Sequence, residues 1–154
     1  MCATLRCNTS KFIEVVWIPD DFYEKLIDEI NRAYAYQMPM ALAITIRKLL
    51  ENLVIDILRK KYGTAGLTLY YDQSRRRFND FSVLLKNLDA KKGDFHYITS
   101  SLDKSFISDL NRYKETGNSG AHSIDTNLVV ERFTAEKDRI KYLVQLLLKV
   151  FQRL

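Results

Sequence analysis

The sequence predicts an all-α fold, a single bundle of four to five helices with a short extended arm at its N-terminus. Three observations predict it: the chain has 154 residues, its hydrophobic share is 47%, and it has only five glycines and two prolines. The length suits one domain, and the hydrophobic share is enough for a core. The scarcity of glycine and proline leaves long stretches without a helix breaker. We expect the arm to comprise residues 1–18 and the helical domain residues 19–154.

The arm and the first helix meet at Pro19. The run before it, KFIEVVWIP, is short and β-branched, which indicates an extended arm or an edge strand lying on the bundle. Asp20 and Asp21 follow, and aspartate at a helix N-terminus caps free N–H groups and suits the helix dipole. Apolar residues then recur at helical spacing, so a first helix is expected over about 20–36.

The second helix is expected to be the central one. Pro39 can open it as its first residue, and no breaker follows until Gly63, a good C-terminal stop. Apolar residues occupy most of its circumference. Its narrow polar sector holds Lys48, Asn52, Asp56 and Arg59.

Arg47 and Glu51 fall inside the apolar arc of this helix. Burying a lone charge is costly, so the two side chains, four residues apart, are expected to pair. One interpretation is a structural ion pair or an arginine that reaches solvent at the rim. The other is that the pair organises a polar site beneath a segment packed over it.

The rest of the chain predicts three further helices. Residues 63–77 are expected to form a connection with a short extended piece at LTLYY. Helices are then expected within 77–89, over 102–116 with its end at Gly117, and from a capping Thr134 to the last residue.

The stretch RYKETGNSGAHS, residues 112–123, holds one of the two histidines. Gly117 is expected to end a helix and Asn118 to cap the next segment. Gly120 has no side chain, so another element can approach the backbone closely there. His122 is either a structural hydrogen-bonding residue or a group that moves protons near neutral pH. If the segment turns helically, Asn118 and His122 share a face.

The formal net charge is +5 and its positive part is clustered. The clusters are residues 59–61, residues 91–92 and the run Arg75, Arg76 and Arg77. Such clusters suit polyanions, and they also fit solvated helix ends and turns. Tyr70 and Tyr71 precede the arginines, an arrangement that can hold single-stranded nucleic acid by stacking.

Other classes of protein are disfavoured. No apolar run approaches the roughly 20 residues that cross a bilayer, and no apolar signal region is found, so a cytoplasmic protein with no membrane partner is expected. Cys2 and Cys7 are expected to be free thiols, and no metal or cofactor is expected. His96, between aromatic residues, is expected to pack. No phosphate-binding loop, dinucleotide fingerprint or nucleophile elbow is present.

Two motifs taken together resemble the HEPN superfamily. One is Arg-x-x-Leu-Glu on the second helix, here from Arg47 to Glu51. The other is Gly-Asn-x-x-Ala-His, here from Gly117 to His122. The resemblance spans roughly residues 15–150, and the most similar branch is a domain of unknown function often appended to restriction enzymes.

The resemblance implies an all-α bundle that commonly forms a homodimer. Active HEPN members are metal-independent RNases of defence and toxin systems. Their motif is an arginine, a polar residue, a few further residues and a histidine, and two motifs face each other across the dimer. Here Asn118 matches the polar residue and His122 the histidine, but Gly117 stands at the arginine position. The cations available to replace that arginine are Arg47, Arg112 and Lys114.

Two functions are therefore expected. The first is a HEPN-like module that dimerises and binds RNA, a nucleotide or a protein partner in a defence or restriction-associated setting. The second is a metal-independent endoribonuclease in which His122 moves a proton and a displaced cation stabilises the transition state. The candidate catalytic residues are His122, Asn118, Arg112 and Lys114. The candidate binding residues are Arg47, Glu51, Gly117, Ser119, Arg75, Arg76 and Arg77.

Overall fold

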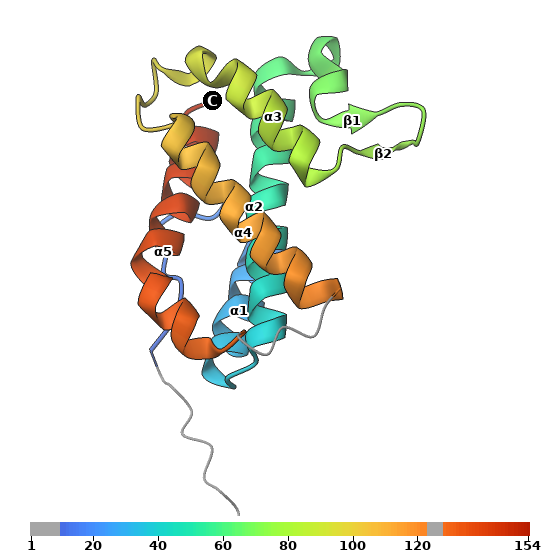
Figure 1. Cartoon of the computed structure of the whole chain (residues 1–154). Helices are drawn as coiled ribbons and strands as arrows, with labels where there is room; N and C mark the ends of the chain where they lie inside the picture. The colour runs from blue at the N-terminus through green and yellow to red at the C-terminus, as the bar shows by residue number, and fades with distance from the viewer. Residues whose placement is uncertain (1–9, 123–127) are drawn as a thin grey trace, which may run out of the picture.

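The computed structural model describes residues 10–122 and 128–154, with the backbone alone at residue 122. Its α-helices are α1 (Asp21–Ala35), α2 (Pro39–Tyr62), α3 (Phe81–Lys91), α4 (Lys104–His122) and α5 (Val130–Arg153). Two short 3₁₀ helices, η1 (Thr64–Leu69) and η2 (Lys92–Phe95), and a hairpin of two short strands, β1 (Tyr71–Asp72) and β2 (Arg77–Phe78), connect them. The predicted all-α bundle is confirmed (Figure 1).

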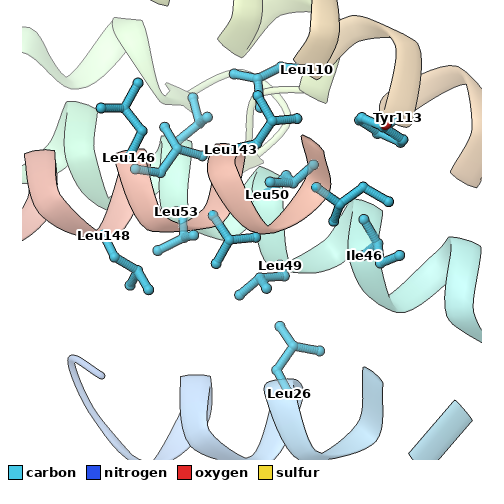
Figure 2. Close-up of a cluster of buried hydrophobic side chains, with 14 of the residues drawn as sticks. Leu26, Ile46, Leu49, Leu50, Leu53, Leu110, Tyr113, Leu143, Leu146 and Leu148 are labelled. Atoms are coloured by element: carbon cyan, nitrogen blue, oxygen red, sulfur yellow. The ribbon is translucent and has the colours of Figure 1, made fainter. Parts of the chain in front are cut away.

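Helix α2 is the centre of the bundle, as the sequence predicts. It begins with Pro39 at its first turn and is capped by Gly63, whose φ is +57°. It contacts α1, α3, α4 and α5. Figure 2 shows Leu49 and Leu53 of α2 lying between Leu26 of α1 and Leu143 of α5. The apolar circumference of α2 is thus covered by helices on several sides, and burial of these side chains drives the packing.

The predicted cap of α1 is present. The Asp20 side chain accepts hydrogen bonds from the backbone N–H of Phe22 at 2.9 Å and of Tyr23 at 3.2 Å. These two N–H groups have no partner inside the helix, so the carboxylate satisfies them and also faces the positive end of the helix dipole.

The described part of the arm lies on the bundle without forming a strand. Phe12 and Ile13 are buried. The backbone N–H of Ile13 donates to Asn31 Oδ1 at 2.8 Å, and Asn31 Nδ2 donates to the Ile13 carbonyl at 3.0 Å. The edge-strand alternative is therefore wrong for residues 10–18, because a side-chain amide of α1, not a neighbouring strand, satisfies this backbone.

Three further details differ from the prediction. The piece expected to be extended, residues 67–71, is largely 3₁₀ helix η1, and the strand begins only at Tyr71. Helix α5 begins at Val130, so Thr134 does not cap it; its hydroxyl donates to the Val130 carbonyl at 3.2 Å instead. His96 is exposed, so its expected packing role is wrong.

Candidate functional site at the α2–α4 crossing

Helix α4 does not end at Gly117 but continues through it to residue 122. The prediction of a turn with Asn118 as a cap is therefore wrong. Glycine weakens a helix but does not stop it where tertiary packing holds both sides. Gly117 and Gly120 are both buried, and they face α2.

The two glycines let α4 approach α2 closely. A Cβ at Gly117 would lie 2.4 Å from Arg47 Cβ and 2.6 Å from Arg47 Cδ, closer than two non-bonded carbon atoms approach. A Cβ at Gly120 would lie 3.3 Å from Ala43 Cβ. We call this contact, formed by Ala43, Arg47, Gly117 and Gly120, the α2–α4 crossing. The stem of Arg47 fills the space that a side chain at position 117 would take.

Arg47 and Glu51 form the ion pair that their spacing predicts. Arg47 Nη1 donates to Glu51 Oε2 at 3.0 Å. The two side chains are 29% and 20% exposed, so the pair lies at the rim of the core rather than in its dry interior. The guanidinium also lies over the ring of Phe81 of α3, with Cζ 5.8 Å from the ring centroid, which is within cation–π range.

One polar atom at the crossing has no hydrogen-bond partner among the described residues. Arg47 Nε is buried, and it forms no hydrogen bond with the part of the chain that the structure describes. A buried N–H without an acceptor costs free energy, because it has lost water and gained nothing in return. The guanidinium thus keeps one unmet donor and partial access to solvent, which are properties suited to an anionic ligand.

Burial of the Glu51 side chain favours its protonated form. Burial raises the pKa of the Glu51 carboxyl, Arg47 opposes this rise, and the nearby carboxylate of Asp80 adds to it. A carboxyl near a guanidinium usually has a lowered pKa, so desolvation outweighs the pairing here. Asp80 also accepts a hydrogen bond from Arg77 Nη2 at 3.1 Å, which links this environment to the β1–β2 hairpin.

The other candidate residues of α4 divide between two sides of the helix. Lys114 lies one turn before Asn118, and residues four apart share a helix face. The Lys114 side chain is only 11% exposed and pairs with Glu115 at 2.9 Å. Arg112 points instead to α5, where it pairs with Glu136. Arg112 is thus directed away from the crossing.

The side of α4 that faces α5 holds an open groove of about 460 Å³. It is lined by Arg112, Glu115, Thr116, Ser119 and Arg132. Glu136 organises this side, since it also accepts a hydrogen bond from Tyr113 Oη at 3.1 Å. Burial and the Glu136 carboxylate together raise the pKa of the Tyr113 hydroxyl, so Tyr113 stays a neutral donor.

His122 is placed only as backbone at the end of α4. Its side chain lies outside the described residues, as does Ser123. The condition that Asn118 and His122 share a face is met by the backbone, because both belong to one helix and are four residues apart.

The three arginines of the basic run lie away from α4, in and beside the loop of the β1–β2 hairpin. Arg75, Arg76 and Arg77 are all exposed. The structure therefore brings Arg47, Glu51 and Gly117 together and leaves the arginine run as a separate surface. Sequence reasoning missed Asp80 and Phe81, since only folding brings the start of α3 to the middle of α2. Their one signal was the cluster of aromatic and acidic residues after the arginines.

Comparisons with family models, with curated proteins and with solved structures find no match to this chain. The described residues contain no group of three or more histidine, cysteine or acidic side chains that could hold a metal ion. Within the same residues, no helix has the length and apolar character needed to span a membrane.

Proposed function

We propose that this chain is a HEPN-like helical module that binds RNA at the α2–α4 crossing. The observation that carries the proposal is the position of Arg47. The HEPN motif has its arginine where this chain has Gly117, and the stem of Arg47 lies directly against Gly117. Helix α2 would thus supply, from the side, the cation that α4 lacks.

The chemistry of the crossing supports an anionic ligand. The guanidinium of Arg47 is held by Glu51 and Phe81 but retains a buried Nε–H without an acceptor among the described residues. A phosphate oxygen is a suitable acceptor for a guanidinium, because both present paired hydrogen-bonding atoms in matching geometry. The net charge of +5 favours the approach of such a ligand.

The test compares two charge-neutral double variants of the full chain. Arg47→Met with Glu51→Gln keeps the apolar stem against Gly117 and leaves the net charge unchanged. Lys92→Met with Asp89→Asn does the same to the ion pair of 2.8 Å at the end of α3. Binding is measured by the fluorescence anisotropy of a labelled single-stranded RNA of about 12 nucleotides, a length within the site sizes of single-strand binders.

We expect the first double variant to lose about tenfold in affinity, as for the loss of one charge-assisted contact, and the second to bind like the parent chain. Equal losses in both would mean that any binding is diffuse. No binding by the parent chain at low salt would overturn the proposal.

A second candidate function is metal-independent cleavage of RNA. It is favoured by the same placement of Arg47, since a cation near Gly117 would lie beside the helix face of Asn118 and His122. The 2′-hydroxyl would attack phosphorus and lose its proton to a base such as His122, while the bond to the 5′-oxygen breaks. The products would be a 2′,3′-cyclic phosphate and a 5′-hydroxyl, the latter formed when the leaving oxygen takes up a proton.

This candidate predicts cleavage in EDTA of RNA but not of DNA of the same sequence, because DNA lacks the attacking hydroxyl. His122→Ala is expected to abolish cutting with a nearly unchanged thermal midpoint. Intact RNA after prolonged incubation with the parent chain would leave the binding module as the function.

We propose further that the chain forms a homodimer and acts in a defence or restriction-associated setting. A different protein partner is the alternative that the test below distinguishes. Large apolar side chains are exposed just before and within the first turns of α2, namely those of Tyr36, Met38, Met40 and Ile44. The Met40 carbonyl lies 3.6 Å from the Cβ position at Gly120, so the backbone at the start of α2 adjoins the last turns of α4. Burial of such a group is a usual reason for association. Light scattering at micromolar concentration should give a particle mass of twice the chain mass of 18.0 kDa, and the Ile44→Glu variant should give the mass of a single chain.

A further inference from the structure

The β1–β2 hairpin carries a second feature that suits a phosphate ligand. Tyr71 pairs with Phe78 and Asp72 with Arg77 in antiparallel register. In Figure 1 the hairpin extends from the bundle on the same side of the view as the C-terminal end of α4. Its loop, residues 73–76, is exposed.

The loop is held in one conformation by Asp72. Asp72 Oδ1 accepts hydrogen bonds from the Ser74 hydroxyl at 2.6 Å, the Ser74 backbone N–H at 3.0 Å and the Arg75 backbone N–H at 3.1 Å. These bonds, the Ser74 hydroxyl first, lower the pKa of the Asp72 carboxyl, so it remains an acceptor. The turn of the loop is thus stabilised by a side chain of the hairpin itself.

Arg76 occupies a backbone conformation that favours glycine. Its φ is +53°, in the left-handed region, where a Cβ is crowded by the backbone. The one other non-glycine residue with positive φ in the described chain is Gln37, just after α1. There the backbone N–H groups of Gln37 and Met38 donate to carbonyls in the last turn of the helix, which is a usual way for a helix to end. The turn accounts for the conformation at position 76 but not for the choice of arginine there.

The three arginines of the hairpin are not equivalent. Arg77 pairs with Asp80 at 3.1 Å, and Arg75 lies 3.6 Å from both Asp72 and Asp80. The Arg76 side chain forms no hydrogen bond or ion pair with the described residues, and it is exposed. Among the three arginines of the hairpin, Arg76 is thus both the one whose side chain has no polar partner in the described chain and the one with a positive φ.

The same hairpin carries an aromatic pair, of which Phe78 lies two residues from Arg76 along the chain. The rings of Tyr71 and Phe78 meet edge to face with centroids 5.8 Å apart, and Phe78 is 45% exposed. An exposed ring and an exposed guanidinium on one short hairpin suit a single strand, whose bases stack on rings and whose phosphates pair with cations.

The hairpin is connected to the crossing through the start of α3. Arg77 binds Asp80, the Asp80 carboxylate contributes to the raised pKa of Glu51, and the next residue, Phe81, lies under the guanidinium of Arg47. A strand bound at Arg47 would thus leave the crossing close to the hairpin.

We propose that the β1–β2 hairpin is a second contact for the same single-stranded RNA, with Arg76 on a phosphate and Phe78 under a base. The inference rests on the proposed function and gives it a ligand class, a strand longer than one nucleotide. An anionic membrane is a poorer match, since the hairpin tip carries no apolar residue and the carboxylates of Asp72 and Asp80 lie among the arginines.

The test uses Arg76→Gly in the full chain. This change removes the cation and suits the backbone, so the fold is expected to be retained, and the thermal midpoint of the variant checks this. Arg76→Lys keeps the charge, and Arg32→Ala removes one exposed cation from α1 as the matched control. Anisotropy is measured with labelled single-stranded RNAs of about 12 and about 3 nucleotides, lengths that bracket the reach of a small single-strand site, at several salt concentrations.

We expect Arg76→Gly to weaken binding of the longer RNA about tenfold and to reduce the salt dependence by about one phosphate contact. Phe78→Ser is expected to weaken it by about tenfold, as for the loss of one stacked base. Arg76→Lys and Arg32→Ala should bind the longer RNA with nearly the affinity of the parent. The short RNA should bind Arg76→Gly and the parent with the same affinity.

The two proposals fail in different ways. If the parent chain binds RNA, and the double variant of Arg47 and Glu51 weakens it but Arg76→Gly does not, the hairpin inference alone is overturned. It is overturned too if Arg32→Ala weakens binding as much, or if Arg76 matters only for vesicles of phosphatidylserine. If the parent chain binds no RNA, the proposed function falls first.

Discussion

Two regions of this molecule hold a residue that the local backbone disfavours: a glycine inside a helix at the α2–α4 crossing, and an arginine at positive φ in the β1–β2 hairpin. At the α2–α4 crossing, Gly117 lies inside a helix, where glycine is a poor residue, because Arg47 takes the space of a side chain. At the hairpin, Arg76 lies at a positive φ, where glycine is the better residue, although its side chain has no polar partner in the described chain. Packing explains the glycine at the crossing. No packing contact within the described chain explains the arginine in the hairpin, and this contrast points to an external ligand for Arg76.

The strongest test of the contrast adds atoms at the crossing. Gly117→Val should lower the free energy of unfolding by about 3 kcal/mol, because its Cβ and methyl groups must displace the stem of Arg47. Ala121→Val, on an exposed position of the same helix, should change it by less than about 0.5 kcal/mol. Urea denaturation measures both. A similar small effect at both positions would show that α4 moves away easily and that the crossing is loose.

Removing the arginine tests the same contact from the other helix. Arg47→Ala should destabilise by about 1.5 kcal/mol, because it removes packing and leaves Glu51 half-buried and unpaired, while loss of the unmatched Nε–H offsets part of this cost. Arg112→Ala removes an arginine that is 44% exposed, against 29% for Arg47, and should cost about 0.5 kcal/mol. If Arg112→Ala cost more than Arg47→Ala, the contact of α4 with α5 would stabilise the fold more than the α2–α4 crossing does, which would contradict this expectation.

The pH dependence of stability reports on Glu51. Its pKa is raised in the folded state, so the folded chain holds this proton to higher pH than the unfolded chain does. The stability contribution of Glu51 is fully present below its ordinary pKa and is lost as the pH rises through the raised value. Urea midpoints measured from about pH 3.5 to 7, a range that spans this loss, should therefore fall less with rising pH in Glu51→Gln than in the parent. Glu115→Gln, at an exposed position, serves as the control, and parallel curves for all three would contradict the expectation.

The smallest expected effect has the opposite sign. Arg76→Gly should raise the free energy of unfolding by about 0.5 kcal/mol, because relief of the left-handed backbone exceeds the added freedom of the unfolded chain. Gln73→Gly, in the same loop, should lower it slightly, since no positive φ is relieved there. Calorimetry of both variants measures the difference. A destabilised Arg76→Gly would mean that the arginine stabilises its own loop.

The sequence predicted those features that depend on neighbours along the chain. The Asp20 cap, the start of α2 at Pro39, its end at Gly63 and the pairing of Arg47 with Glu51 all follow from spacing within one helix. The end of α4 was predicted wrongly, because local propensity at Gly117 competes with close packing on α2, and that packing is invisible until the partner helix is known.

The same limit applies to the candidate site. Phe81 and Asp80 reach the crossing only because α3 folds back along α2, and Arg112 leaves it only because Glu136 of α5 attracts it. The grouping of Arg47 with Gly117 was one of several alternatives in the sequence, and spacing alone could not select it. The conformation of Arg76 likewise depends on a hairpin whose strands are two residues each, too short for a period-2 pattern to appear.

The double hydrogen bond between Asn31 and Ile13 fixes the leading segment to α1. Phe12 and Ile13 are part of the buried core, and Val15, Trp17 and Ile18 pack against it. Exchanging the Asn31 amide for a carboxylate would remove a donor and set an acceptor against the Ile13 carbonyl, so the segment would be held less firmly. Limited proteolysis would then cut this segment faster than it cuts the same segment of the parent chain.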